Sequence, residues 1–189
     1  VMEGKCVLFK EFGNVNAVPI CLDTQDTEEI IATVKNIAPA FGGINLEDIS
    51  APRCFEIEER LKEMLNIPVF HDDQHGTAIV VLTGIINGLR VTGKKKEDCR
   101  VVVNGAGSAG VAITKLLLTY GFRHVTMCDR EGIIGKNYPN LNWMQKKMTE
   151  VTNLENAKGT LADALKGADI FVGVSAPNIV TPEMVASMN

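Results

Sequence analysis

Apolar residues follow two patterns that alternate along most of the chain. Short continuous runs such as 101–103 are typical of buried strands, whereas apolar positions three or four residues apart are typical of amphipathic helices. Ile30, Val34 and Ile37 show the helical spacing within a predicted helix at 26–37. The alternation of the two patterns predicts an α/β fold with parallel sheets and helices on both faces.

The predicted elements fall into two α/β units. Strands are predicted at 6–9, 18–22, 44–49, 68–70, 99–104, 124–128 and 169–174. Helices are predicted at 26–37, 52–65, 77–91, 108–120, 141–151 and 160–165, with another beginning at 181–183. The helix at 77–91 is expected to be largely buried, and 132–140 is expected to be a loop. We expect one domain at 1–71 and a second at 72–189.

Composition and charge narrow the classes of function. The chain is 46% hydrophobic and 22% charged, which is typical of a globular protein. Its net charge is −4 and its longest basic block is Lys94-Lys95-Lys96, so nucleic acids and anionic membranes are poor candidates as partners. The most apolar stretch, 78–89, is too short and too polar to span a bilayer. Five scattered cysteines without a CxxC motif indicate reduced thiols and a cytoplasmic location.

A glycine-rich sequence follows the strand predicted at 99–104. Residues 105–110 read G-x-G-x-x-G and open a predicted helix, and Asp129 ends the next predicted strand. This context matches the dinucleotide-binding fingerprint of a Rossmann-type domain. Gly105 would permit the tight turn, Gly107 would let a pyrophosphate approach the backbone, and Gly110 would let the helix pack closely on the strand. The alternative is a tight turn that binds nothing.

Two neighbouring residues leave the choice of cofactor open. Asp129 can accept hydrogen bonds from the adenosine ribose hydroxyls and would repel a 2′-phosphate, which favours NAD. Arg130 could instead hold that phosphate, which would favour NADP.

Two acidic pairs follow predicted strands. Glu47-Asp48 ends one strand, and Asp72-Asp73 comes directly after another. Because the carboxyl ends of parallel strands line the ligand crevice, these pairs could supply oxygen ligands to Mg²⁺ or Mn²⁺. The alternatives are solvated loop charge and helix capping, by Asp48 or Ser50 for the helix at 52–65 and by Asp73 for the helix at 77–91.

Three basic residues, of which His71 and His75 flank the second acidic pair, could also take part in chemistry. His71 and His75 are spaced to clasp a metal on a helix, but packing or hydrogen bonding at a strand-to-helix turn is the preferred interpretation. Lys5 could act as a general base if it is desolvated, although most lysines are solvated.

Several segments together resemble malic enzyme in its shorter bacterial-type form. They are Met2-Glu3-Gly4-Lys5, 42–49, 52–58, 68–78 with its Asp-Asp-Gln-His-Gly-Thr-Ala sequence, 103–110 and 173–177. The resemblance covers essentially the whole chain. It implies oxidative decarboxylation of L-malate to pyruvate and CO₂ with reduction of NAD or NADP.

The resemblance also implies site residues. Glu47, Asp48 and Asp73 would hold the divalent metal, and Lys5 would be the general base with Asp72 as its carboxylate neighbour. The residues implied for cofactor binding are Thr77, Asn104, Gly105, Gly107, Ser108, Ala109, Gly110, Asp129, Arg130, Ser175 and Ala176. A homodimer or larger assembly is also implied.

The resemblance is incomplete in two respects. The family protonates the enol with a tyrosine upstream of the lysine, and neither Tyr120 nor Tyr138 lies in a matching segment. Its malate-binding asparagines are not matched by Asn178 or Asn189. We therefore expect a fragment that lacks both ends and is inactive or nearly so alone. The alternatives are malolactic enzyme, which releases lactate, and a catalytically silent NAD(P)-binding module.

Overall fold

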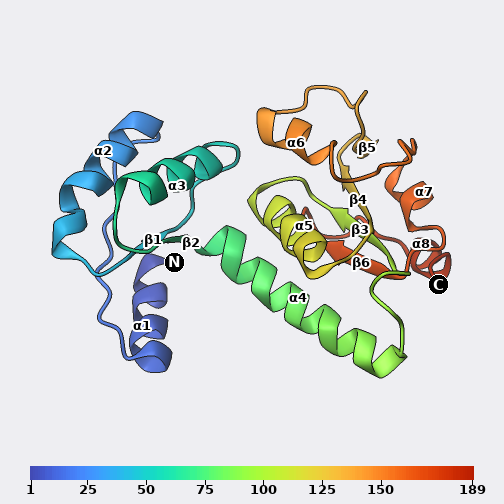
Figure 1. The fold of residues 1–189 in the computed structure, drawn as a ribbon, viewed down its shortest axis with the longest axis horizontal. Helices are drawn as coiled ribbons and strands as arrows, with labels where there is room; N and C mark the ends of the chain where they lie inside the picture. Colours follow the sequence, from blue (N-terminus) through green and yellow to red (C-terminus); the bar gives the residue numbers. More distant parts are fainter. The chain divides into compact units, whose positions relative to one another are not determined.

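The computed structural model describes residues 1–189 and contains two compact units (Figure 1). The first unit comprises residues 1–47 and 56–70, and the second comprises 48–55 and 71–189. Cys54 and Phe55 are buried in a hydrophobic cluster with Ala106, Met127 and other residues of the second unit. The segment 48–55 therefore packs with sequence far downstream of it.

The first unit contains four helical segments and two short strands. They are α1 (Met2–Gly13), α2 (Thr27–Ile37), the 3₁₀ helix η1 (Ala38–Ala40), β1 (Ile44–Leu46), most of α3 (Arg53–Met64) and most of β2 (Val69–His71). The carboxylate of Asp26 caps α2 by accepting hydrogen bonds from the backbone N–H groups of Glu28 and Glu29. Ile30, Ile31 and Val34 form its buried face, as their spacing predicted.

Two strands predicted near the N-terminus are wrong. Residues 6–9 lie within α1, and 18–22 form no strand. A four-residue apolar run does not by itself distinguish a strand from part of a helix. In the second case Pro19 lacks the backbone N–H that a strand ladder uses.

The second unit is built around a four-stranded sheet. Its elements are α4 (Asp72–Thr92), β3 (Arg100–Asn104), α5 (Ser108–Tyr120), β4 (His124–Asp129), β5 (Gly132–Ile133), α6 (Trp143–Met148), α7 (Leu161–Leu165), β6 (Ile170–Gly173) and α8 (Pro182–Ala186). The strand order is β5-β4-β3-β6. Strand β3 runs parallel to β4 and β6, and the short β5 runs antiparallel to β4. The sequence predicted a loop where β5 lies.

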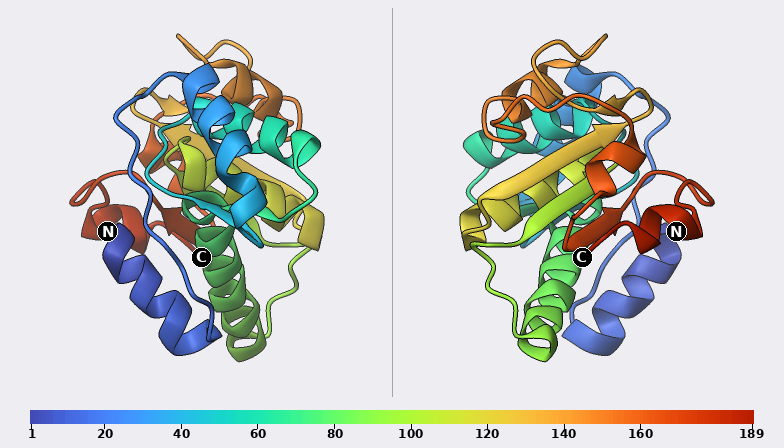
Figure 2. Two further views of the ribbon diagram at one scale, coloured as in Figure 1. Left: turned by 90° about the vertical axis from the view of Figure 1, so that its left-hand side faces the viewer. Right: turned by 90° about the vertical axis from the view of Figure 1, so that its right-hand side faces the viewer.

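Helices cover both faces of this sheet, as the sequence predicted. Val101 and Val103 of β3 pack with residues of α4 and α5, whereas Val102 packs with residues of α7 on the opposite face. In the right-hand view of Figure 2, β4 and β3 lie side by side and α7 lies over one face of the sheet. Successive side chains of β3 point to opposite faces of the sheet, and helices pack on both faces, as in a Rossmann-type domain.

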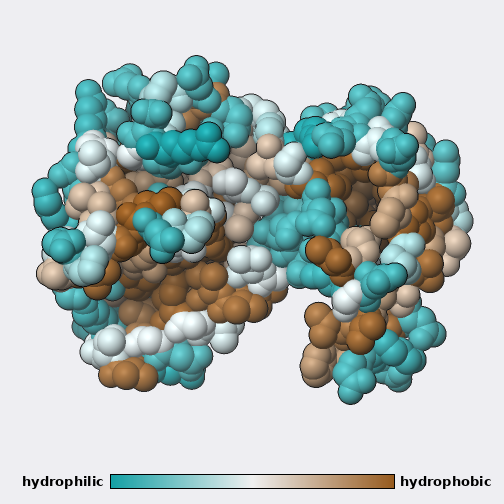
Figure 3. Space-filling model, turned by 180° about the vertical axis from the view of Figure 1, so that it is seen from behind, coloured by the Kyte–Doolittle hydropathy of each residue, from teal (hydrophilic) through white to brown (hydrophobic).

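The prediction of a buried helix at 77–91 is wrong in two respects. Helix α4 begins at Asp72, and only Gln74 and Ala78 in it are buried. Ile79, Val80 and Val91 are exposed. The apolar sequence did not specify which faces would be covered, and α4 packs on α5 along one side only. Figure 3 shows hydrophobic side chains at the surface over α4 and, in the first unit, over α1. None of the helices combines the length and apolar character needed to cross a bilayer.

Candidate functional site

Asp48 and Asp73 lie together in the second unit. The backbone N–H of Asp48 donates to the Asp73 carboxylate at 3.1 Å, and the two carboxylates offer oxygen atoms within 4.8 Å of each other. Asp48 follows β1 and has a φ of 56°, a left-handed conformation that is uncommon for a residue with a side chain. Asp73 is in the first turn of α4. The cap expected from Asp73 is wrong, because α4 starts at Asp72 with no side-chain cap and Asp73 lies inside the helix.

Glu47 and Lys5 form an ion pair in the first unit. The Lys5 ammonium lies 3.2 Å from Oε2 of Glu47, whose side chain is only 5% exposed. Asn45 donates to the same oxygen at 3.0 Å. Glu47 directly precedes Asp48, so its Cα lies about 3.8 Å from that of Asp48 through the trans peptide. The backbone thus joins this ion pair to the Asp48–Asp73 contact.

The His71 side chain is fully buried and lies next to the Asp73 carboxylate. The side-chain amide of Gln74 lies 2.9 Å from Nδ1 of His71, and Nε2 of His71 lies 3.4 Å from Oδ2 of Asp73. If the amide donates to Nδ1, the neutral ring carries its proton on Nε2, which faces the carboxylate. His71 ends β2 and precedes α4, so the two histidines do not share a helix as a metal clasp would require. Gln74 was not among the residues predicted for the site, and its signal in the sequence was a polar side chain between Asp73 and His75.

Asp72 and Thr77 lie at the start of α4. A Cβ placed on Gly76 would overlap the Asp72 carboxylate, so the Asp72 side chain lies across the helix surface where Gly76 leaves room. Thr77 is half-buried in the following turn.

The glycine-rich loop has a different environment at each glycine. Gly105 has a φ of 114°, and a Cβ there would lie 2.7 Å from the carbonyl oxygen of Val174. A Cβ on Gly110 would overlap the carbonyl of Gly105, whereas one on Gly107 would meet nothing within 4 Å. The turn and the close helix packing therefore require glycine at 105 and 110. Gly107, Ser108 and Ala109 leave the N-terminus of α5 accessible.

Asn104 connects the ends of two neighbouring strands. It is 5% exposed, and its side-chain amide donates to the hydroxyl of Ser175 at 2.9 Å. Ser175 and Ala176 follow β6 and are exposed. The structure thus brings these predicted cofactor residues to the same edge of the sheet as the glycine-rich loop.

Asp129 ends β4 and receives donors at both carboxylate oxygens. The N–H of Arg130 donates to Oδ1 at 2.9 Å, and the side-chain amide of Gln145 donates to Oδ2 at 3.3 Å. The Arg130 side chain is exposed. Gln145 was not among the residues predicted for the site, although the pattern Asn142-x-x-Gln145 is typical of a helix N-terminus with a capping box.

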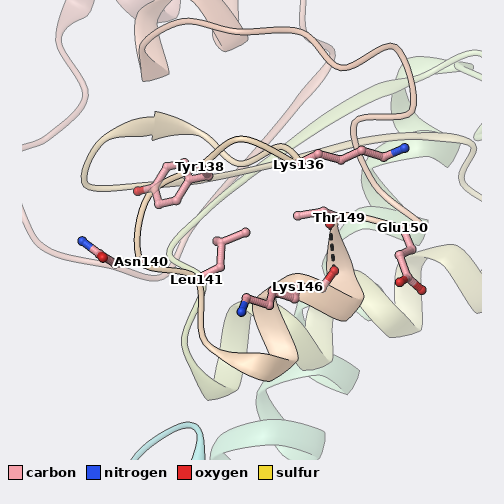
Figure 4. Close-up of a pocket in the computed structure, with 7 residues that line it drawn as sticks. All are labelled: Lys136, Tyr138, Asn140, Leu141, Lys146, Thr149 and Glu150. Carbon is pink, nitrogen blue, oxygen red and sulfur yellow. Dashed lines mark hydrogen bonds between the residues drawn. The ribbon is translucent and has the colours of Figure 1, made fainter.

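A pocket of about 550 Å³ lies beside α6 and contains none of the predicted site residues (Figure 4). It is lined by Lys136, Tyr138, Asn140, Leu141, Lys146, Thr149 and Glu150. The Tyr138 hydroxyl accepts a hydrogen bond from the Glu131 N–H at 2.9 Å. Burial raises the pKa of Tyr138 above its usual value.

Two family models match the chain. The malic enzyme N-terminal domain matches residues 1–62, and the malic enzyme NAD-binding domain matches residues 74–189. The second match alone covers more than half of the chain.

Known proteins agree with these matches over the whole chain. The chain is 60% identical to the NAD-dependent malic enzyme of Geobacillus stearothermophilus and covers 39% of its length. It is 53% identical to the bifunctional malic/malolactic enzyme of Bacillus subtilis (strain 168) and covers 46% of it. The crystal structure of the NAD-dependent malic enzyme from Thermotoga maritima matches all of this chain and 50% of its own, with a TM-score of 0.96 and 51% identity. The chain spans half or less of each of these proteins, and it belongs to the malic enzyme family.

Proposed function

We propose that this chain carries the metal ligands, general base and nucleotide-binding domain of an enzyme that oxidatively decarboxylates L-malate. The products would be pyruvate, CO₂ and reduced NAD or NADP. The observation that most directly supports this proposal is the contact between Asp48 and Asp73, which are 25 positions apart in the chain. Binding of a nucleotide alone would not require this pair of carboxylates.

The donor set fits a hard divalent cation. Asp48 and Asp73 offer carboxylate oxygens within 4.8 Å of each other, and Glu47 is the adjacent residue. Oxygen-only donors suit Mg²⁺ or Mn²⁺ and do not favour zinc. When bound, such an ion would polarise the C2 oxygen of the substrate.

Lys5 is our proposed general base. It would accept the proton of the C2 hydroxyl as hydride leaves C2 for the nicotinamide, and return that proton to the enolate oxygen when CO₂ departs. Its pairing with Glu47 holds the ammonium in a defined place, with Asn45 fixing the same carboxylate. We propose Asp72 as a second carboxylate that orients Lys5.

The nucleotide would bind at the edge of the sheet formed by the ends of β3, β4 and β6. The accessible N-terminus of α5 would receive the pyrophosphate, and Asp129 would accept hydrogen bonds from the adenosine ribose. We propose that Thr77, Asn104, Ser108, Ala109, Ser175 and Ala176 line this site. Asp129 favours NAD over NADP, although the exposed Arg130 offers a cation for a 2′-phosphate.

Calorimetric titration of the chain with NAD⁺ and NADP⁺, each with and without Mn²⁺ and L-malate, tests this proposal. We expect one nucleotide to bind, and to bind more tightly in the presence of Mn²⁺ and malate. Asp73→Asn should abolish the effect of Mn²⁺ and leave the binding of nucleotide alone unchanged. A chain that binds neither nucleotide would contradict the proposal.

Malolactic chemistry is a second candidate. A relative 53% identical to the chain is named a bifunctional malic/malolactic enzyme. Both reactions would use the same metal and nucleotide sites. They differ in the net reduction of the cofactor, because a malolactic reaction releases lactate without net production of NADH. Absorbance at 340 nm, measured on the full-length protein with malate, therefore separates the two.

We also propose a homodimer or larger assembly and a cytoplasmic location. The exposed Val7, Leu8 and Phe12 of α1 support an assembly, since hydrophobic side chains that gather in an exposed patch are typical of interaction surfaces. All five cysteines are free, which suits a reducing compartment. Analytical ultracentrifugation of the full-length protein tests the assembly. A protein that stays monomeric at all concentrations would contradict this proposal.

A further inference from the structure

Gln145 connects the glycine-rich loop to Asp129. Its side-chain nitrogen lies 3.3 Å from the carbonyl oxygen of Ala106 and 3.3 Å from Oδ2 of Asp129. Its side-chain oxygen accepts a hydrogen bond from the N–H of Asn142 at 3.1 Å. The amide therefore uses both N–H donors and its carbonyl in contacts with three separate segments of the unit.

The orientation of this amide is fixed by its partners. Reversing it would place the amide oxygen against a carbonyl oxygen and a carboxylate, both of which are acceptors only. Helix α6 is also fixed in place, because Met144 and Met148 are 1% and 2% exposed and Asn142 forms a reciprocal capping box with Gln145. The donor is thus presented to Asp129 from a rigid element.

Asp129 is consequently held from two sides. The N–H of Arg130 donates to Oδ1 and Gln145 donates to Oδ2. A carboxylate has about four acceptor sites, so two donors fix its plane and leave acceptor capacity for the vicinal hydroxyls of a ribose. Without Gln145, rotation about the Asp129 side chain would be opposed at one oxygen only.

We infer that Gln145 is a positioning residue for the nucleotide site. It orients the Asp129 carboxylate toward the adenosine ribose diol and ties it to the glycine-rich loop that would carry the pyrophosphate. This inference rests on the proposed function, because it assumes that Asp129 binds the ribose. It adds to that function a residue in the helix that follows the β4–β5 hairpin.

Three variants separate positioning from helix capping. Gln145→Met removes both donors and the acceptor. Gln145→Glu keeps an oxygen acceptor for the Asn142 N–H but removes the donors. Asn142→Ala weakens the cap of α6 and leaves the Gln145 donors in place. The probe is NAD⁺, and its dissociation constant is measured by calorimetry on the 189-residue chain.

We expect both Gln145 variants to weaken NAD⁺ binding by about tenfold, the effect of one lost hydrogen bond to a charged group. We expect Asn142→Ala to change it by less than about twofold while lowering the melting temperature. In an Asp129→Ala background, Gln145→Met should add less than about twofold, because the residue it positions is gone.

Two outcomes would overturn the inference. One is an equal loss from Gln145→Met with and without Asp129, which would mean that Gln145 does not act through that carboxylate. The other is a loss of NAD⁺ affinity in Asn142→Ala as large as that in Gln145→Met, which would mean that Gln145 acts only by capping α6.

A readout without nucleotide keeps the inference separate from the proposed function. If the native chain binds neither nucleotide, the proposed function fails. The side-chain torsion of Asp129, measured by NMR coupling constants, then decides the inference. We expect one rotamer in the native chain and averaged couplings in Gln145→Met, and a single unchanged rotamer in the variant would contradict it.

Discussion

The side-chain amide of Asn104 donates a hydrogen bond to the hydroxyl of Ser175 at 2.9 Å, 71 positions further along the chain. Asn104 ends β3 opposite Gly173 of the parallel strand β6. The bond therefore holds the segment after β6 beside the glycine-rich loop, where the Gly105 backbone closely approaches Val174. The nucleotide site proposed above depends on this pairing of two strand ends.

Removing the hydroxyl of Ser175 should destabilise the second unit. Ser175→Ala leaves the buried amide of Asn104 without this acceptor, and we expect the free energy of unfolding to fall by about 1–2 kcal/mol. Ser175→Thr keeps a hydroxyl and serves as the matched control. Urea denaturation of the three proteins measures the difference, and equal stabilities would show that the bond contributes nothing.

Alanine at Gly110 and alanine at Gly107 should differ in their effects on stability and on nucleotide binding. Gly110→Ala places a Cβ against the Gly105 carbonyl, so we expect unfolding to become easier by about 2 kcal/mol or more. Gly107→Ala meets open space at a φ of −86°, so stability should stay within about 0.5 kcal/mol. Gly107→Ala should nevertheless weaken NAD⁺ binding, because the added methyl group faces the proposed pyrophosphate position.

Thermal melting and calorimetry of the same two variants check this prediction. A Gly107→Ala protein that binds NAD⁺ like the native chain would contradict the proposed position of the pyrophosphate. A Gly110→Ala protein that melts like the native chain would contradict the close contact between α5 and the loop.

The ion pair between Lys94 and Asp169 should make stability depend on pH. The ammonium lies 2.6 Å from Oδ1 of Asp169, and the Arg100 N–H donates to Oδ2 at 2.9 Å. The hydrogen bond from Lys94, followed by that from Arg100, lowers the pKa of Asp169 below its usual value. A lowered folded-state pKa gives stability that is present above the unfolded pKa of about 3.9 and is lost as the pH falls through the folded pKa.

We therefore expect Asp169→Asn to be less stable than the native chain by about 1 kcal/mol at pH 7 and to approach it below about pH 4. Denaturation at a series of pH values measures this difference. In a Lys94→Met background the pH-dependent part of the stability difference should shrink, because the Lys94 hydrogen bond is the largest cause of the lowered Asp169 pKa. A difference that stays constant from pH 7 to pH 3 would contradict the prediction.

Cys128 should resist alkylation in the folded protein. Burial, and secondarily the charge of Asp129, raise the pKa of its thiol to about 12. Since the thiolate is the reactive form, iodoacetamide at pH 8 should modify the exposed Cys21 and leave Cys128 unmodified until the chain unfolds. Mass spectrometry of peptides locates the label. Rapid modification of Cys128 under native conditions would mean that β4 opens readily.

The second unit was more predictable from the sequence than the first. Helix α5 has the limits that were expected, and β3 and β4 differ from expectation by one residue at an end. Long apolar strands followed by glycine turns leave few alternatives, so local signals agree with one another there. In the first unit, residues 6–9 of α1 were predicted to be a strand. None of the α1 side chains is buried, and burial of one face is what gives a helix its periodic pattern.

The sequence by itself determined the α/β class, the glycine-rich turn and the acidic pairs at strand ends, because each depends on residues close together in the chain. Only the tertiary structure decided that Asp48 contacts Asp73, that His71 lies buried behind it, and that Gln145 reaches Asp129. The first and last of these contacts join segments that are far apart in the sequence, and the sequence separation of two residues does not say how close they lie in space. They depend on how helices pack on the sheet, and that packing is set by many weak interactions distributed along the chain.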